Sequence, residues 1–446
     1  MTIETVTIRY VGAEGDGIAS ADDGAALYVP NTLPGEIVQV QRHRRQGDGW
    51  LARSVAIESA SEARIAPACK HFGECGGCVL QHWRNAEYLA WKTGLLASAL
   101  RRAGFAEPSL DPIIVTPPYS RRRMDLAASR TPDGVMVGLH SRVTSPPTRA
   151  RSARAAPRGK GQPAPASLCD IAECHVLHPS LFRLVSPLRV LLARLRGVRR
   201  DASIVANLLS DGVDLLLRTD AALAPPDRSI LVTFARTQRL LRISWAMMRG
   251  EPEPVVILAP PRITLSGVAV EPPPGAFLQA SAEGEAAIAE AVTSGLPNTL
   301  PARTSVAELY AGCGTLTFAL SQRARISAWE GDNAAVSALR QAANHAGLTG
   351  RIVTAQRDLA RQPLLASDFA RFVAIVLDPP FAGAAAQMGQ VAAARPPCVI
   401  YVSCNPAVLA RDARMLRDAG YELARATPID QFVWSARLES VSVFRR

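Results

Sequence analysis

Cys404 stands between an apolar run and a predicted helix start, a position that suits a nucleophilic thiol. The run Val399–Val402 is typical of a buried parallel strand. Asn405 and Pro406 are favourable at the N-cap and the first position of a helix, and Gly420 predicts where that helix ends. A thiol at such a turn lies beside the positive end of the helix dipole, which favours the thiolate. The alternative, common for cysteines at strand ends, is an inert buried side chain.

A glycine-containing loop that suits a nucleotide ligand lies upstream of Cys404. Val306–Tyr310 predicts a strand that enters the loop Ala311–Thr315, whose glycines allow the backbone to approach a ligand closely. Thr317 stands where a dinucleotide fingerprint has its third glycine, which disfavours NAD, and no Lys-Ser/Thr pair follows, which disfavours an ATP loop. Glu330 ends the next strand, where a carboxylate can accept both ribose hydroxyls.

Two further acids follow in the same order along the chain. Asp358 follows a third predicted strand and Asp378 ends a fourth. The ordered set is similar to that of class I S-adenosylmethionine methyltransferases. Asp378-Pro379-Pro380-Phe381 also resembles enzymes that methylate amino groups of adenine, in which the aromatic side chain stacks on a flipped base. On this tetrapeptide alone, the adenine reaction is favoured.

A group of cysteines near the N-terminus is the second candidate site. Cys69, Cys75 and Cys78 are closely spaced, and Cys174 follows at a distance. Such a set can hold zinc or an iron–sulfur cluster, and the spacing leaves both open. Cys169 is a further cysteine that competes for the fourth position.

The composition indicates an ordinary globular protein with a polyanionic partner. The 446 residues carry a formal net charge of +11, almost all of it from arginine, which forks onto phosphates and stacks on bases. No apolar run approaches a membrane span, and the first residues lack the features of a signal peptide. We therefore expect a cytoplasmic protein with a nucleic-acid partner and no membrane partner.

The elements that position these residues fall into three predicted domains. Short strands and turns over residues 1–58 predict a small β-barrel, from which the basic run Arg42–Arg45 projects. Residues 59–270 predict a central α+β domain with the cysteines, a helix over 85–104 and a disordered insertion over 141–168. Strands and helices alternate over 271–446, which predicts a doubly wound parallel α/β sheet, Rossmann-like, of the class I methyltransferase type.

Read together, these motifs resemble those of the bacterial RNA uracil-5-methyltransferases, specifically the branch that acts on 23S ribosomal RNA. The motifs that carry the resemblance are Cys69-x5-Cys75-Gly76-Gly77-Cys78, Gln279 in Phe277-Leu278-Gln279, Tyr310–Thr315, Asp378-Pro379-Pro380, Ser403-Cys404-Asn405-Pro406 and Glu439. The resemblance implies that the barrel is a TRAM domain and that the protein acts as a monomer on 23S rRNA.

The resemblance also implies roles for the matching residues. Cys404 would attack carbon 6 of uracil, and Glu439 would take the proton from carbon 5. Contacts to S-adenosylmethionine would come from Gln279, Tyr310, Thr315, Glu330, Asp358 and Asp378. A [4Fe–4S] cluster would be held by Cys69, Cys75, Cys78 and Cys174. The three arginines Arg121–Arg123 and the barrel would hold RNA phosphates.

The chain departs from the family pattern at three places. Phe381 stands where arginine is usual, Thr315 where asparagine is frequent, and Phe432–Arg437 where Phe-Pro-His-Thr-x-His is usual. The alternatives are a tRNA uracil-5-methyltransferase, whose branch typically lacks the barrel and cluster, an adenine amino-methyltransferase, and a non-catalytic RNA-binding iron–sulfur protein.

Overall fold

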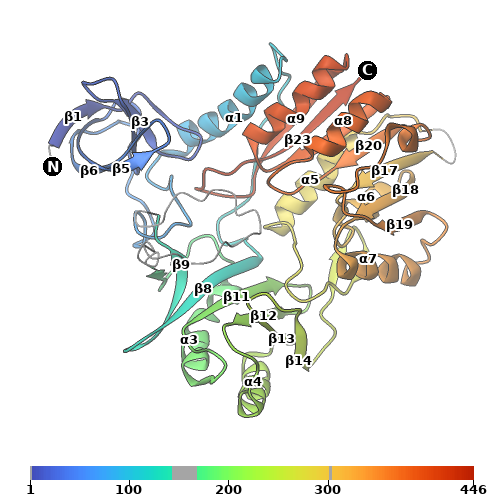
Figure 1. Cartoon of the computed structure of the whole chain (residues 1–446), viewed down its shortest axis with the longest axis horizontal. Helices are drawn as coiled ribbons and strands as arrows, with labels where there is room; N and C mark the ends of the chain where they lie inside the picture. The colour runs from blue at the N-terminus through green and yellow to red at the C-terminus, as the bar shows by residue number, and fades with distance from the viewer. Residues whose placement is uncertain (1–2, 143–167, 301–303) are drawn as a thin grey trace.

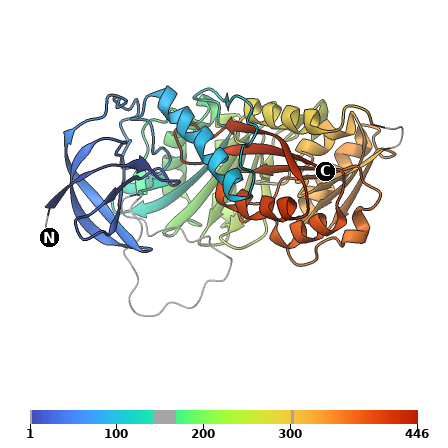
Figure 2. The ribbon, with the colours of Figure 1, turned by 90° about the horizontal axis from the view of Figure 1, so that it is seen from above.

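The computed structural model describes residues 3–142, 168–300 and 304–446, which form a barrel, a central sheet and a C-terminal α/β unit (Figure 1). Figure 2 shows the barrel at one end of the molecule and the C-terminal sheet with its helices at the other. Within the described residues, no helix has both the length and the apolar character needed to cross a membrane.

The N-terminal unit is a six-stranded sheet with the strand order β1-β5-β6-β4-β3-β2. Its strands are β1 (Ile3–Thr7), β2 (Tyr10–Val11), β3 (Gly17–Ser20), β4 (Ala26–Val29), β5 (Ile37–Gln46) and β6 (Gly49–Ser59). Alternate side chains such as Val38 and Val40 point into a small apolar core. The basic run Arg42–Arg45 lies within β5, whose pairing with β6 continues to Gln46.

The helix α1 (Asn85–Arg102) follows the cysteine segment and packs on the C-terminal unit. It ends before Gly104, whose φ of +103° is readily adopted only by glycine. Leu96 of α1 shares a buried core with Leu409 of the C-terminal unit. The strand β7 (Ile114–Val115) pairs with the last part of the C-terminal sheet. Helix α1 and strand β7 therefore pack with the C-terminal unit, although both precede the expected domain boundary at residue 270.

The central unit is a seven-stranded, mostly antiparallel sheet with the order β10-β9-β8-β11-β12-β13-β14. Its strands are β8 (Arg123–Thr131), β9 (Gly134–His140), β10 (Leu168–Asp170), β11 (Asp201–Leu208), β12 (Val213–Thr219), β13 (Arg242–Met247) and β14 (Glu253–Ile257). Its helices are α2 (Pro179–Phe182), α3 (Val185–Arg194) and α4 (Pro225–Gln238). The predicted disordered insertion lies outside the described residues, except for its ends at 141–142 and 168.

The C-terminal unit is built on an eight-stranded sheet with the order β19-β18-β17-β20-β21-β23-β22-β7. Its strands are β17 (Ser305–Leu309), β18 (Arg325–Glu330), β19 (Ile352–Gln356), β20 (Ala374–Leu377), β21 (Cys398–Ser403), β22 (Glu422–Asp430) and β23 (Glu439–Arg445). The first five strands in the order are parallel, and β23 is antiparallel to β21. The carboxyl ends of the parallel strands therefore meet at one edge.

Helices cover both faces of this sheet. They are α5 (Ala282–Gly295), α6 (Thr315–Ser321), α7 (Asn333–His345), α8 (Ala385–Ala394) and α9 (Pro406–Asp418), with a short 3₁₀ helix η1 (Ala366–Phe369) and a small hairpin of β15 (Ile263–Leu265) and β16 (Val268–Val270). Helices α5 to α7 share one apolar core with the sheet, and α1, α8 and α9 share another. Val399 and Ile400 of β21 belong to different cores, as the alternation of side chains in a strand requires.

Candidate active site

The turn that carries Cys404 has the predicted geometry. Strand β21 ends at Ser403 and α9 begins at Pro406. The Asn405 side-chain oxygen caps the helix by accepting hydrogen bonds from Ala407 N at 3.1 Å and Val408 N at 3.4 Å. The thiol is therefore held at the carboxyl edge of the sheet, half-buried, at the start of a long helix.

The expectation that this turn favours the thiolate is wrong for the ligand-free protein. Burial raises the pKa of Cys404 to about 12, and the carboxylates of Glu439 and Asp378 raise the pKa further than the Arg437 guanidinium lowers it. The helix dipole does not compensate for the loss of water around the sulfur. Cys404 is a neutral thiol before substrate binds.

Hydrogen bonds join the predicted base Glu439 to two of the predicted cofactor-binding residues, Gln279 and Asp378. Gln279 donates from Nε2 to Asp378 Oδ2 at 3.2 Å. Gln431 donates from Nε2 to Gln279 Oε1 at 2.9 Å and to Glu439 Oε2 at 2.8 Å. Gln431 was not predicted as a site residue from the sequence, although it directly follows the end of β22 at Asp430.

Glu439 is a buried carboxyl group with one oxygen available. The residue is 4% exposed, and its Oε1 has no hydrogen-bond partner among the described residues. Burial, together with the nearby charge of Asp378, raises the pKa of Glu439 well above its ordinary value. Burial likewise raises the pKa of Asp378. An unpaired buried oxygen close enough to affect the pKa of the Cys404 thiol is suited to taking or giving a proton.

The glycine loop leaves room for a ligand where the sequence predicted it. Gly312 has a φ of +56°, and a side chain there would meet nothing within 4 Å. Its N–H donates to Glu330 Oε2 at 2.9 Å, while Asp332 N donates to Glu330 Oε1 at 2.8 Å. These bonds fix the carboxylate at the end of β18. Tyr310, with a φ of +65°, begins this loop.

The remaining predicted ligand contacts lie at the same sheet edge. Thr315 is the first residue of α6. Asp358 lies just beyond β19, half-exposed, and its Oδ1 accepts from Ala360 N at 3.1 Å. Because β17, β18 and β19 are parallel neighbours, their carboxyl ends bring these residues to one side of the sheet.

The acids of this edge fit a cationic ligand. Burial, with the added charges of Asp378 and Glu330, raises the pKa of Glu308 to about 8. The carboxylates destabilise one another, and a positive charge placed among them relieves that repulsion. The sulfonium of S-adenosylmethionine is such a charge, so the residues present fit this methyl donor.

The four predicted cluster cysteines lie around one cavity. Its volume is about 360 Å³, and its lining includes Cys69, Cys75, Cys78 and Cys174. Cys169 is not part of that lining; it is buried, and its Sγ lies 3.8 Å from His71 Nδ1. A set of four thiols around one space fits an iron–sulfur cluster.

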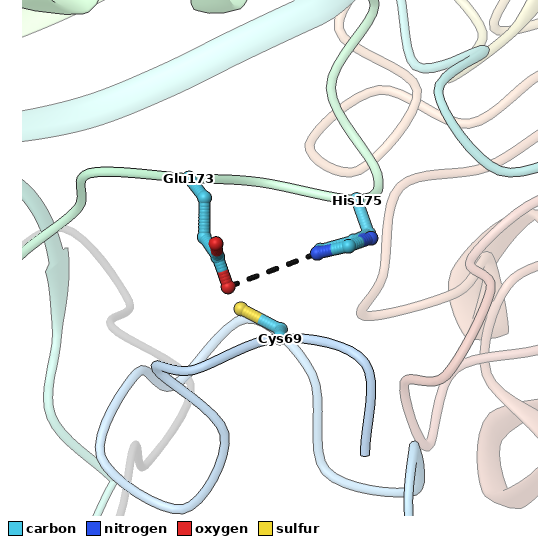
Figure 3. A group of neighbouring side chains, drawn as sticks. All are labelled: Cys69, Glu173 and His175. Carbon is cyan, nitrogen blue, oxygen red and sulfur yellow. Dashed lines mark ion pairs between the residues drawn. The ribbon is translucent and has the colours of Figure 1, made fainter.

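Two further metal-ligating side chains lie beside Cys69. Figure 3 shows Glu173 and His175 pointing toward the Cys69 sulfur. The ligand atoms of the three residues lie within 4.8 Å of one another, and His175 Nε2 lies 3.7 Å from Glu173 Oε1. Sequence spacing did not reveal these two residues, because they flank Cys174 and approach Cys69 only through the fold.

The arginines of the run 121–123 do not form an exposed phosphate clamp. Arg122 is buried and forms an ion pair with Glu285, and its Nε donates to Gln279 O at 3.1 Å. Arg122 therefore helps to hold the backbone of Gln279 in place. Arg121 and Arg123 line the cysteine cavity.

The parallel sheet, the glycine loop and the acids at its edge define a class I methyltransferase domain attached to a small barrel. Residues 275–446 match the family model described as tRNA (Uracil-5-)-methyltransferase, and residues 2–42 match the TRAM domain. An uncharacterized RNA methyltransferase of Mesorhizobium japonicum is 36% identical over 98% of this chain and 97% of the relative. This chain therefore belongs to the TRAM-containing RNA uracil-5-methyltransferase family, and it is an S-adenosylmethionine-dependent enzyme of that class.

Two further comparisons extend over nearly the whole chain. The 23S rRNA (uracil(1939)-C(5))-methyltransferase RlmD of Yersinia enterocolitica is 30% identical over 99% of this chain and 94% of that protein. The crystal structure of Pyrococcus abyssi tRNA (uracil-54, C5)-methyltransferase in complex with S-adenosyl-L-homocysteine has a TM-score of 0.70 at 18% identity, covering 99% of this chain and 100% of that chain. The predicted family and multidomain fold class are confirmed.

Proposed function

We propose that this protein methylates carbon 5 of a uridine in 23S ribosomal RNA through a covalent adduct between Cys404 and carbon 6. The observation that carries the proposal is the convergence of three groups: the Cys404 thiol, the Asp378 and Gln279 pair, and the unpaired oxygen of Glu439. A nucleophile, a group that can bind the pyrimidine or the donor, and a base are the three parts that the reaction needs.

The chemistry follows from the poor nucleophilicity of carbon 5. Addition of the Cys404 sulfur to carbon 6 moves the ring electrons toward oxygen 4, so that carbon 5 becomes an enolate carbon. Carbon 5 then takes the methyl group, and S-adenosylhomocysteine leaves. Glu439 removes the proton from carbon 5, and expulsion of the sulfur restores the double bond.

The buried carboxyl groups of Asp378 and Glu439 are the groups that accept protons during these reaction steps. Because Cys404 is a neutral thiol in the free protein, its proton must pass to a base when the sulfur adds to carbon 6, and we assign it to the ionised Asp378 carboxylate, which leaves Glu439 for the proton of carbon 5. A cationic methyl donor favours ionised Asp378 and Glu439, since it opposes the repulsion that keeps them protonated. Donor binding therefore prepares Glu439 to act as a base.

Ribosomal RNA is preferred over tRNA as the substrate for two reasons. The relative whose name states a 23S rRNA substrate aligns over 99% of this chain. The chain also combines the barrel with the four cysteines, for which we propose a [4Fe–4S] cluster on Cys69, Cys75, Cys78 and Cys174. The tRNA reaction is the second candidate, because the matching family model and the similar crystal structure both carry that name. We propose action as a cytoplasmic monomer.

A methyl-transfer assay tests this proposal. The protein is incubated with tritiated S-adenosylmethionine and either in vitro transcribed 23S rRNA or total tRNA transcripts, and the labelled nucleoside is identified. We expect 5-methyluridine in 23S rRNA. Label in tRNA selects the second candidate, and label on adenine contradicts uracil chemistry altogether.

A further inference from the structure

An exposed aromatic ring and an arginine from distant parts of the chain stack near the catalytic turn. The Phe381 side chain follows the Asp378-Pro379-Pro380 run and is 42% exposed. The Arg437 guanidinium carbon lies 4.5 Å from the centre of its ring. We call this pair the Phe381–Arg437 shelf.

Hydrogen bonds tie both residues of the shelf to the catalytic region. The Phe381 carbonyl accepts from Asn405 Nδ2 at 3.2 Å, and Asn405 directly follows Cys404. The Arg437 carbonyl accepts from the buried Lys92 Nζ at 2.7 Å, and its N–H donates to Ser435 Oγ at 3.1 Å. The backbone of the shelf is therefore held before a ligand arrives, at Phe381 by Asn405 and at Arg437 by Lys92 and Ser435.

The shelf forms one side of an open cleft between the barrel and the segment 435–437. The cleft has a volume of about 600 Å³, and its lining includes Glu14, Arg44, Gly77, Arg142, Phe381 and Arg437. Arginine and aromatic side chains together on a cleft wall are the usual lining of a single-stranded nucleic-acid groove.

The acids in this cleft do not prevent anion binding at Arg437. Asp16 is paired with Arg142 at 2.8 Å. Glu14 approaches Arg437 at 3.6 Å, but both side chains are well exposed, at 69% and 41%. A solvent-exposed pair of this kind contributes little, so a phosphate can replace Glu14. The Arg437 guanidinium can thus exchange Glu14 for a phosphate, while its stacking on Phe381 orients it.

We propose that the Phe381–Arg437 shelf binds the RNA nucleotide next to the target uridine, with the base stacked on the pair and its phosphate on the guanidinium. The inference rests on the proposed function, because it needs an RNA strand whose target base reaches the Cys404 thiol. It gives a role to two of the three places where the sequence departs from the family pattern, residue 381 and the segment 432–437. These departures meet in the shelf.

Binding of fluorescein-labelled octauridine, followed by anisotropy, tests the shelf without requiring methyl transfer. Phe381→Leu and Arg437→Gln should each weaken binding about tenfold, since stacking contributes ~1–3 kcal/mol per base. Phe381→Tyr, which keeps the ring, should bind within about twofold of wild type. Arg361→Gln removes the same charge at a site 87% exposed and outside the cleft, and is the matched control.

Binding of S-adenosylhomocysteine by calorimetry verifies that each variant is folded. Wild-type octauridine affinity in folded Phe381→Leu, or equal losses in Arg437→Gln and Arg361→Gln, would overturn the shelf. If Phe381→Leu does not fold, the comparison of Arg437→Gln with Arg361→Gln decides alone.

A second measurement tests the position of the bound nucleotide. In an RNA fragment that contains the methylated uridine, 2-aminopurine is placed next to that uridine. Wild type should quench its fluorescence by stacking, and Phe381→Leu should quench it less; equal quenching contradicts adjacency. If the shelf variants bind octauridine as tightly as wild type, the shelf is ruled out and the proposed function is unaffected. If wild type binds octauridine but forms no 5-methyluridine, the proposed function is ruled out.

Discussion

Cys404 illustrates how burial outweighs a helix dipole at the scale of single residues. The dipole stabilises a neighbouring negative charge by about 1 kcal/mol. The rise in the pKa of Cys404 from 9.0 to about 12 corresponds to about 4 kcal/mol against the thiolate. The sequence around Cys404 indicates the turn and the dipole. Asp378 and Glu439 were expected in the site, but their effect on the pKa of the thiol depends on how other strands place them. The charge state of the nucleophile was therefore beyond sequence analysis.

Glu439→Gln tests the raised pKa of the proposed base through stability. The carboxyl is neutral in the fold at low pH, where glutamine imitates it, so the two proteins should have equal stability there. Because the pKa of Glu439 is raised in the folded protein, the stability of wild type falls as the pH rises from the ordinary value of 4.5 to the folded pKa. Wild type should lose about 1.4 kcal/mol per pH unit relative to the variant over that window.

Urea unfolding of both ligand-free proteins at several pH values measures this difference. Parallel stability profiles for wild type and Glu439→Gln would show that the carboxyl has an ordinary pKa. In that case Glu439 would already be ionised in the ligand-free protein, and donor binding would not be needed to prepare it as a base.

At the scale of elements, the loop 431–438 connects the catalytic network to the rest of the fold. Lys92 of α1 is fully buried, forms an ion pair with Asp430 and donates to Phe432 O at 3.1 Å and Arg437 O at 2.7 Å. Tyr88 OH donates to Asp430 Oδ2 at 2.6 Å and accepts from Trp434 N at 2.8 Å. Helix α1 thus holds the loop that carries Gln431 and leads into β23.

Lys92→Met should destabilise the protein by about 3–5 kcal/mol, because it leaves the buried Asp430 carboxylate without its cation. The loop should also loosen, which lowers methyl transfer more than it lowers S-adenosylhomocysteine binding. Urea unfolding and calorimetry give the two readouts. Arg361→Met, an equally large change at an exposed site, is the control, and equal stability losses in both variants would contradict the role of Lys92.

Elements with strong local signals were predicted well, and those set by distant contacts were not. The start of α9 at Pro406 and the alternation from β17 to β21 follow from capping residues and apolar runs. The continuation of β5 through Arg42–Arg45 was not predicted, because it depends on pairing with β6. Arg122 was misread as a phosphate ligand because Glu285, its buried partner, lies far along the chain.

At the scale of the whole molecule, the cysteine segment is joined to the catalytic loop. Val79 N and Leu80 N, directly after Cys78, donate to Trp434 O at 2.8 Å and 3.0 Å. The proposed cluster therefore braces the loop 431–438 from one side while α1 holds it from the other. No sequence motif indicates this connection, because it is made by backbone groups.

Removal of the proposed cluster should loosen that loop. Anaerobically purified protein should contain about four irons per chain, and Cys174→Ala should lose them while Cys169→Ala retains them. Hydrogen exchange of residues 430–438 should be faster in iron-free protein and in Cys174→Ala. Stoichiometric zinc in place of iron would contradict the cluster. Hydrogen exchange at 430–438 that is the same with and without iron would contradict its bracing role.

The covalent role of Cys404 is the central claim, and adduct trapping tests it most directly. The protein is incubated with S-adenosylmethionine and 23S rRNA that carries 5-fluorouridine, whose fluorine cannot be removed as a proton. A denaturation-resistant RNA–protein complex should form with wild type and be absent with Cys404→Ala, although both bind S-adenosylhomocysteine. A complex that persists in Cys404→Ala, or no complex from wild type that methylates unmodified RNA, would contradict the mechanism.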